Sequence, residues 1–264
     1  MRILFIGDVI AKPGRRAVAA LLPLLRRELE LDLVIANGEN SAGGVGITRG
    51  TAADLFAAGV DLVTTGNHVW RQREALTYLP TTSKVVRPAN LPPDAPGLDA
   101  TLVRVGDTPV LLTNVLGRVF MAPMDDPFRA LDAVLARYEG AARVVVADIH
   151  AEATSEKRAL GFHLDGRASL VAGTHTHVPT ADAQILPGGT AYVTDVGMVG
   201  PLHSVIGVEV EPTVQRYRTA LPRKAGTATG GAIQFNAVLA DIDGASGRAR
   251  DIARVDRLVT LDGD

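Results

Sequence analysis

The 264-residue chain is 47% hydrophobic and 21% charged, which fits one large domain with a well-filled core. Its net charge of −2 comes without a basic block, so the clustered Lys and Arg that tight binding to duplex nucleic acid requires are missing. The absence of Cys excludes disulfides and thiolate metal ligands, so any metal must be held by His, Asp, Glu or Asn.

No part of the sequence has the pattern of a membrane segment. No apolar stretch approaches the ~20 residues that span a bilayer. Asp8 interrupts the N-terminal apolar run too early for a signal peptide. We therefore expect a cytoplasmic protein without a membrane partner.

Strands and helices are expected to alternate in the first part of the chain. Short apolar runs predict strands, and apolar residues at helical spacing predict helices. Pro23 is expected to kink or split its helix, and Gly59 to end the next one. The alternation is typical of βαβ units in a largely parallel sheet. The expected elements, in chain order, are the strand Arg2–Ile6, the helix Gly14–Leu31, the strand Leu33–Ala36, the helix Ala52–Ala58, and the strands Leu62–Thr65 and Val85–Arg87.

The pattern changes near Pro92, where turn residues begin to separate neighbouring apolar runs. Gly106-Asp107 predicts a hairpin and hence antiparallel pairing. Gly188-Gly189 and Asp243-Gly244 predict two more strand connections, and residues 224–231 predict a loop. Ser155 is a candidate cap for its helix. The expected elements are the strands Thr101–Val105 and Val110–Asn114, the helix Pro127–Tyr138, the strand Arg143–Ile149, the helix Ser155–Phe162, and the strands Leu170–Ala172, Ala183–Leu186, Ala191–Thr194, Ala232–Ala240 and Ala249–Leu261.

These elements predict an α/β fold. We find no internal repeat and no clear linker, so residues 1–264 are expected to form a single domain. The expected architecture is a layered sandwich, in which two mixed sheets pack face to face and helices cover them on the outside.

Five predicted strands are followed directly by polar motifs, which core packing does not require. In an open α/β fold, such side chains converge at one edge of a sheet. Together they predict a two-metal hydrolytic centre. The motifs are Gly7-Asp8, Asn37-Gly38-Glu39-Asn40, Gly66-Asn67-His68, Asp148-Ile149-His150 and Gly173-Thr174-His175-Thr176-His177.

His175 and His177 are the sharpest feature of this set. If the segment is extended, residues at i and i+2 project from the same face. One ring could then serve each ion of a pair ~3.5–4 Å apart. The alternative is two half-buried histidines on the face of a strand.

Carboxylate and amide groups supply the remaining candidate ligands. Asp8 could be a ligand or a helix cap, and Glu39 is the best-placed carboxylate to bridge two ions. Asn40 adds an amide oxygen, whereas Asn37 could instead tie down its own turn.

Asn67 and His68 offer different chemistry side by side. Asn67 can ligate through oxygen without adding charge, and the imidazole of His68 points elsewhere. Imidazole titrates near neutrality, which makes His68 the natural general acid. His150 is expected to be a further ligand, and Asp148 to orient a ligand ring.

The remaining candidates have more open roles. Glu152 could support a ligand or be a loop charge. His163 is expected to have a surface or packing role, and His203 could face substrate or be structural. Lys12 and Arg15 could steer an anionic substrate, although solvated surface charge is the alternative.

These motifs resemble those of the calcineurin-like metallophosphoesterases, and most closely the YmdB-like bacterial branch, over nearly the whole chain. The family is marked by an Asp after the first strand, a G-N-H block and a closing G-x-H-x-H. The resemblance implies a four-layer αββα metallophosphoesterase-like domain. Besides the five polar motifs, it is carried by Pro13-Gly14-Arg15, Ala151-Glu152, Thr154-Ser155-Glu156-Lys157 and Thr194-Asp195-Val196-Gly197-Met198.

The chain departs from the broad superfamily at two of its ligands. The usual D-x-H is Asp8-Val9-Ile10 here, and Glu39 replaces the usual bridging aspartate. Asn40 can supply the ligand lost at position 10. Exchanging imidazole for an amide oxygen favours iron, with manganese next, over zinc. By resemblance, one ion takes Asp8, Glu39, Asn40 and His177, and the other takes Glu39, Asn67, His150 and His175.

The resemblance also implies the activity, which is hydrolysis of small phosphodiesters such as 2′,3′-cyclic AMP. In this chemistry two cations neutralise phosphoryl charge and a bridging hydroxide is the nucleophile. His68 would protonate the departing ribose oxygen. The alternatives are a metallohydrolase acting on acyl substrates and a regulatory binder with incidental catalysis. The sequence leaves the base preference open, and equally whether the chain forms a homo-oligomer.

Overall fold

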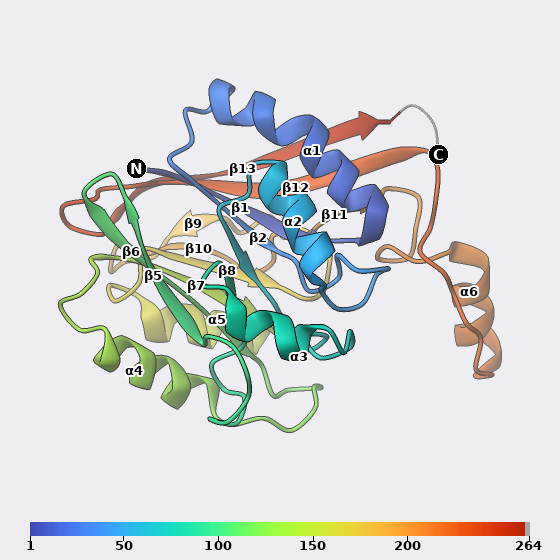
Figure 1. The fold of residues 1–264 in the computed structure, drawn as a ribbon, viewed down its shortest axis with the longest axis horizontal. Coiled ribbons are helices and arrows are strands. Elements are labelled where there is room, and N and C mark those ends of the chain that lie inside the picture. Colours follow the sequence, from blue (N-terminus) through green and yellow to red (C-terminus); the bar gives the residue numbers. More distant parts are fainter. Residues whose placement is uncertain (262–264) are drawn as a thin grey trace.

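Two mixed β-sheets lie face to face at the centre of the computed structural model, which describes residues 1–261 (Figure 1). Strands β1, β2, β3 and β4 run parallel to one another, whereas β12 is antiparallel to both β1 and β11. The first sheet has seven strands in the order β13 (Ala249–Thr260), β12 (Ala232–Ile242), β11 (Met198–Pro201), β1 (Arg2–Val9), β2 (Leu33–Asn37), β3 (Leu62–Thr64) and β4 (Val85–Val86).

The second sheet has six strands and the same mixed character. β6, β7, β8 and β10 are parallel, and the edge strands β5 and β9 are antiparallel to their neighbours. The spatial order is β5 (Ala100–Val105), β6 (Thr108–Leu116), β7 (Val144–His150), β8 (Leu170–Thr174), β10 (Ala191–Val193) and β9 (Gln184–Ile185).

Helices cover the outer faces of the two sheets. α1 (Ala11–Glu28) and α2 (Arg49–Ala57) pack on the seven-stranded sheet, and α4 (Pro127–Arg137) and α5 (Thr154–Leu164) lie against the six-stranded one (Figure 1). The remaining helical segments are α3 (Ala75–Tyr78), the 3₁₀ turn η1 (Leu79–Thr81) and α6 (Val210–Thr219). Among residues 1–261, no helix is long and apolar enough to cross a membrane.

Three hydrophobic cores separate the four layers. One lies between α1, α2 and the first sheet, one between the two sheets, and one between the second sheet and α4 and α5. Alternation along β1 shows how this arises: Leu4 and Ile6 face the helices, whereas Ile3 and Phe5 face the other sheet. The expected sandwich of two mixed sheets between helical layers is therefore confirmed.

The structure agrees better with the predicted strand connections than with the predicted helix ends. The hairpins at Gly106-Asp107 and Asp243-Gly244 and the β9–β10 pairing are confirmed. The predicted cap at Ser155 is wrong, because α5 begins at Thr154 after Ala153, which makes no side-chain cap. β11 and α6 were not predicted, since neither segment has a clear apolar period.

Pro23 does not split the first helix. α1 is one uninterrupted element that begins at Ala11 and contains Pro23 in its interior. Proline removes the hydrogen bond to the carbonyl four residues earlier, which here belongs to Ala19. Both Ala19 and Pro23 lie on the exposed side of the helix, so water can take the place of the missing donor.

Candidate metal centre

The polar motifs meet at one edge of the sandwich, where strands of both sheets end. Asp8 lies near the end of β1, Glu39 and Asn40 follow β2, and Asn67 and His68 follow β3 in the first sheet. From the second sheet, His150 ends β7, and His175 and His177 follow β8. Sequence reasoning placed all eight side chains at one edge, and the structure brings all eight together in a single cluster.

Glu39 lies at the centre of this cluster and is fully buried. Its Oε1 is 3.1 Å from Nδ1 of His68, 3.3 Å from Nε2 of His150 and 3.2 Å from Nδ2 of Asn40. Its Oε2 accepts a hydrogen bond of 2.9 Å from the backbone N–H of His68. One carboxylate therefore contacts candidate ligands from both sheets.

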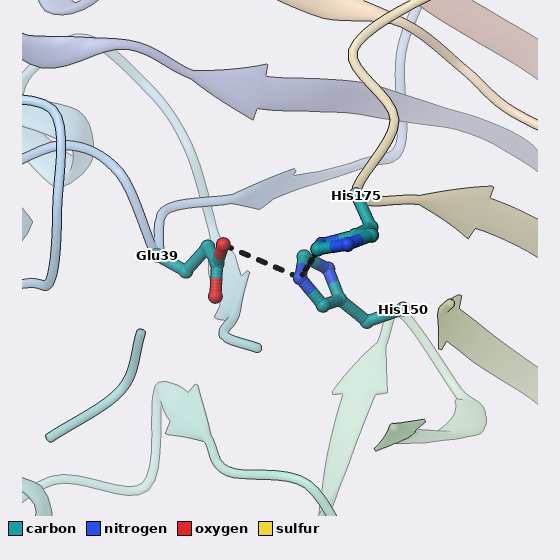
Figure 2. Close-up of side chains that lie close together, drawn as sticks. All are labelled: Glu39, His150 and His175. Carbon is teal, nitrogen blue, oxygen red and sulfur yellow. Dashed lines mark hydrogen bonds and ion pairs between the residues drawn. The ribbon is translucent and has the colours of Figure 1, made fainter. Parts of the chain in front are cut away.

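His150 shows that the donor atoms fit a cation. Its Nε2 is 3.1 Å from Nδ1 of His175 and 3.3 Å from Oε1 of Glu39 (Figure 2). The same Nε2 is 2.9 Å from Oδ1 of Asn67. A ring nitrogen carries one hydrogen or one lone pair and cannot satisfy three such partners at once. Ligand atoms of Glu39, His150 and His175 all lie within 4.8 Å of one another. Oxygen and imidazole donors of this kind suit a divalent transition metal.

A second group of candidate ligand atoms lies around the side-chain amide of Asn40, next to Glu39. Nε2 of His177 is 3.6 Å from Oδ1 of Asp8 and 3.2 Å from Nδ2 of Asn40. The amide oxygen of Asn40 faces Nδ1 of His68 at 2.7 Å. For Asn40 to bind a metal through this oxygen, its side-chain amide would therefore have to flip, so that its oxygen and nitrogen exchange positions. Only the hydrogen-bond partners distinguish the two orientations of an amide.

The backbone of the His-x-His motif is not extended, so the expected extended segment is wrong. β8 ends at Thr174, and φ is 93° at His175 and 64° at His177. The rings reach the cluster from a turn, not from the face of a strand. The backbone N–H of His175 is held by Oδ2 of Asp8 at 3.1 Å, a contact between distant parts of the chain.

Asp148 supports the His150 ring through a threonine. Oδ1 of Asp148 accepts a bond of 2.6 Å from Oγ1 of Thr174, which lies 2.8 Å from Nδ1 of His150. Its Oδ2 accepts from Thr64 and Asn37. Complete burial raises the pKa of Asp148 to about 6. The predicted orienting role fits this geometry, with Thr174 between the two groups.

The carboxylates of the cluster stay ionised although they are buried. Burial raises the pKa of Glu39, but the attraction of His150 and His68 outweighs it and holds that pKa well below its usual range. Burial likewise raises the pKa of Asp8, but the charge and the hydrogen bond of His177 outweigh burial, so this pKa lies below its usual value. Two buried anionic groups make the cluster attractive to cations.

The imidazoles of His150, His175 and His177 respond to their surroundings in opposite directions. Burial lowers the pKa of His150, but the charge of Glu39 outweighs this and raises it to about 9. Burial and the charge of His150 lower the pKa of His175 to about 4. The pKa of His177 is raised by Asp8 against the effect of burial. Without a cation, the site therefore holds a proton on His150 and a free lone pair on His175.

His68 and Asn67 face different partners, as their sequence context predicted. Asn67 is directed to His150, whereas Nδ1 of His68 contacts Glu39 and Asn40. The His68 side chain is 26% exposed. It is therefore half-buried at the mouth of the cluster.

The other candidates divide between the rim and the surface. Oε2 of Glu152 is 3.2 Å from Nε2 of His175, which places this carboxylate at the rim. His163 pairs with Asp132 away from the cluster, and His203 is exposed. Arg15 is bound to Asp54 and to the carbonyl of Ser41, and Lys12 is exposed at the start of α1. Asn37 ties down its turn, as predicted, by accepting from the Glu39 N–H.

Comparison with known proteins finds a matching family and a named relative. Residues 4–255 match the model of the YmdB-like protein family. The chain is 43% identical over 255 residues to a Bacillus subtilis (strain 168) protein named 2′,3′-cyclic-nucleotide 2′-phosphodiesterase, covering 97% of this chain and 96% of that protein.

Solved structures show the same fold. A hypothetical protein from Thermus thermophilus is 50% identical, with a TM-score of 0.92 over 98% of this chain and 99% of that one. An NAD nucleotidase from Haemophilus influenzae, 14% identical, has a TM-score of 0.57 over 100% of this chain and 60% of its own. The second likeness is one of fold alone.

Proposed function

Because this chain belongs to the YmdB-like family of the calcineurin-like metallophosphoesterases, we propose that it is a metal-dependent phosphodiesterase acting on 2′,3′-cyclic nucleotides. The observation that carries the proposal is that Glu39 contacts members of both groups of candidate ligands. Oε1 of Glu39 is 3.3 Å from Nε2 of His150 and 3.2 Å from Nδ2 of Asn40. The relative from Bacillus subtilis bears the name of this activity.

The seven candidate ligands divide into two sets that share Glu39. Asp8, Asn40 and His177 would hold one cation together with it, and Asn67, His150 and His175 would hold the other. Two cations bound there would neutralise charge on the phosphoryl oxygens and supply a hydroxide as nucleophile near neutral pH. The amide oxygens in both sets favour iron or manganese over zinc.

His68 would supply the proton that the leaving group needs. Glu39 and Asn40 contact its Nδ1, so Nε2 is the ring nitrogen that would carry the transferable proton. The departing atom of a 2′,3′-cyclic nucleotide is a ribose oxygen, which is a poor leaving group without a proton. General acid catalysis of this kind contributes typically ~10²–10⁴-fold.

A substrate panel tests the proposal. The protein, loaded with iron or manganese, should hydrolyse 2′,3′-cyclic AMP and other small phosphodiesters and leave carboxylic esters and amides intact. Removal of the metal with a chelator should abolish this turnover, and the added metal should restore it. Faster turnover of acyl substrates than of phosphodiesters would contradict the proposal and favour a metallohydrolase of the other class.

A further inference from the structure

Two sequence motifs that the proposed metal site leaves without a role meet behind it. Lys157, from Thr154-Ser155-Glu156-Lys157 in α5, places its Nζ 2.6 Å from Oδ2 of Asp195, from Thr194-Asp195-Val196-Gly197-Met198. Both side chains are only 1% exposed. Burying two charges costs desolvation free energy, so such a pair is weak evidence for a purely stabilising role.

Asp195 uses the same carboxylate to hold the turn that carries the two histidines. Its Oδ2 also accepts from the backbone N–H of Thr176 at 3.2 Å and from Oγ1 of Thr176 at 2.7 Å. Its Oδ1 accepts from the N–H of Gly197 at 2.8 Å. Thr176 lies between His175 and His177, so Asp195 fixes the residue that joins them.

This turn needs support from outside. Both histidines have positive φ, a conformation that non-glycine residues rarely adopt and that persists only where the surroundings hold it. The N–H of Val196 adds a bond of 2.8 Å to the carbonyl of Gly173, just before the turn. A Cβ on Gly173 would meet the carbonyl oxygen of Thr194 at 1.7 Å, so the two segments pack as closely as they can.

The same segment also holds Asp8. The carbonyl of Gly197 accepts from the N–H of Asp8 at 3.0 Å, and Oδ2 of Asp8 accepts from the N–H of His175. The Asp195 turn is therefore bonded to the backbone of one candidate ligand and to the residue between two others. Asp8, His175 and His177 share this one support.

We propose that Lys157 and Asp195 are positioning residues for the metal centre, an inference that rests on the function proposed above. Lys157 fixes the Asp195 carboxylate, and Asp195 sets the Thr176 turn so that the rings of His175 and His177 face Glu39 and Asp8. Neither residue touches a ligand atom of the cluster directly. Partners of this kind orient metal ligands and tune affinity without binding the metal.

The test measures cation affinity, which a merely structural role would not change in a folded protein. Metal-free wild type, Lys157→Met and Asp195→Asn are titrated with Mn²⁺ well below their melting temperatures. Both Mn²⁺ dissociation constants should rise roughly 10–100-fold in the two variants, because both cations depend on the turn. Arg167→Met is the matched control, since it removes an exposed ion pair with Asp132 on the outer side of the second sheet.

Two further variants keep the test decisive if a lone buried charge prevents folding. The double variant Lys157→Met with Asp195→Asn removes both charges of the pair, and Thr176→Val removes only the hydroxyl bond to Asp195. Both should bind Mn²⁺ more weakly than Arg167→Met does. Unchanged dissociation constants in the folded variants would overturn the positioning role. Failure of wild type itself to bind two cations would instead count against the proposed function.

Discussion

Oε1 of Glu39 and Nε2 of His150 lie 3.3 Å apart although they come from different sheets. Glu39 follows β2 in the seven-stranded sheet, and His150 ends β7 in the six-stranded one. Because the inter-sheet core holds β2 and β7 together, the site exists only when the two sheets are packed. Packing of the sandwich and assembly of the candidate metal centre are thus one event.

Replacement of Glu39 by Gln should weaken binding of both cations. A carboxylate shared between two sites contributes charge to each, and an amide does not. The loss should be at least about tenfold for each cation, as loss of even an outer-shell partner is typically 10–100-fold. Metal analysis and calorimetric titration measure it, with the exposed Glu30→Gln as control. Loss of one cation with full retention of the other would show that Glu39 does not bridge.

Replacement of His68 by Ala should leave the metal content intact and slow hydrolysis according to the leaving group. The expected loss is about 10²–10⁴-fold for 2′,3′-cyclic AMP, whose ribose oxygen needs a proton. It should be small for a nitrophenyl phosphodiester, because nitrophenolate departs without one.

His163→Ala provides a matched control for this variant. The His163 side chain is 27% exposed, against 26% for His68, but it lies away from the cluster. It should therefore change neither rate. Equal losses on both substrates in His68→Ala, or loss of metal, would make His68 a ligand or a positioning residue.

Cation affinity should depend on pH through His150. Its pKa of about 9 means that the metal-free protein carries a proton on this ring at neutral pH, and a cation must displace it. The apparent dissociation constant should therefore fall by about tenfold per pH unit between pH 7 and pH 9 and then level off. Calorimetry in buffers of different ionisation enthalpy should detect the released proton. An affinity independent of pH over this range would contradict the prediction that a cation must displace a proton from His150.

The raised pKa of His150 also makes the stability of the metal-free protein depend on pH. The folded pKa of His150 is raised from 6.5 to about 9, so its contribution to the metal-free protein is complete below pH 6.5. That contribution is lost as the pH rises through about 9. Urea unfolding of metal-free protein should therefore show lower stability at pH 9 than at pH 6. A matching series with bound metal should show a smaller loss.

Gly66 should not tolerate even one added methyl group. A Cβ at this position would lie 2.3 Å from Oε2 of Glu39 and 2.4 Å from Nε2 of His150. Gly66→Ala should displace both groups, weaken cation binding and cost about 1–3 kcal/mol of stability. Gly50→Ala is the control, because a Cβ there meets only Thr48 Oγ1 at 3.9 Å. Wild-type metal affinity in Gly66→Ala would mean that the site is less tightly packed than the structure shows.

The sequence was most informative where short-range patterns determine structure. Apolar runs located the strands, and the polar residues that follow them, such as Asp8 and His150, mark the edge where those strands end. The backbone of His175 and His177 could not be predicted in this way. Its turn depends on Asp195 and Asp8, which lie outside the motif, 19 residues after Thr176 and 167 residues before His175. Whether the ligand atoms hold a metal remains a prediction.

Helix boundaries were harder to predict from the sequence, because they depend on which side of a helix the fold leaves exposed to water. Taken alone, Pro23 predicts a break in the helix, but its exposed position in α1 lets water satisfy the carbonyl that it leaves free.

The burial of Lys157 could not be predicted either, since its partner Asp195 comes from another part of the chain. Only the packed structure reveals such pairs.

The most direct test of the account is the metal content of anaerobically purified protein, measured together with its activity on 2′,3′-cyclic AMP. We expect two cations per chain, iron or manganese, and activity that falls as they are removed and returns as they are restored. Full activity in protein that binds no metal would contradict the account, because the cluster around Glu39 and His150 would then have another purpose.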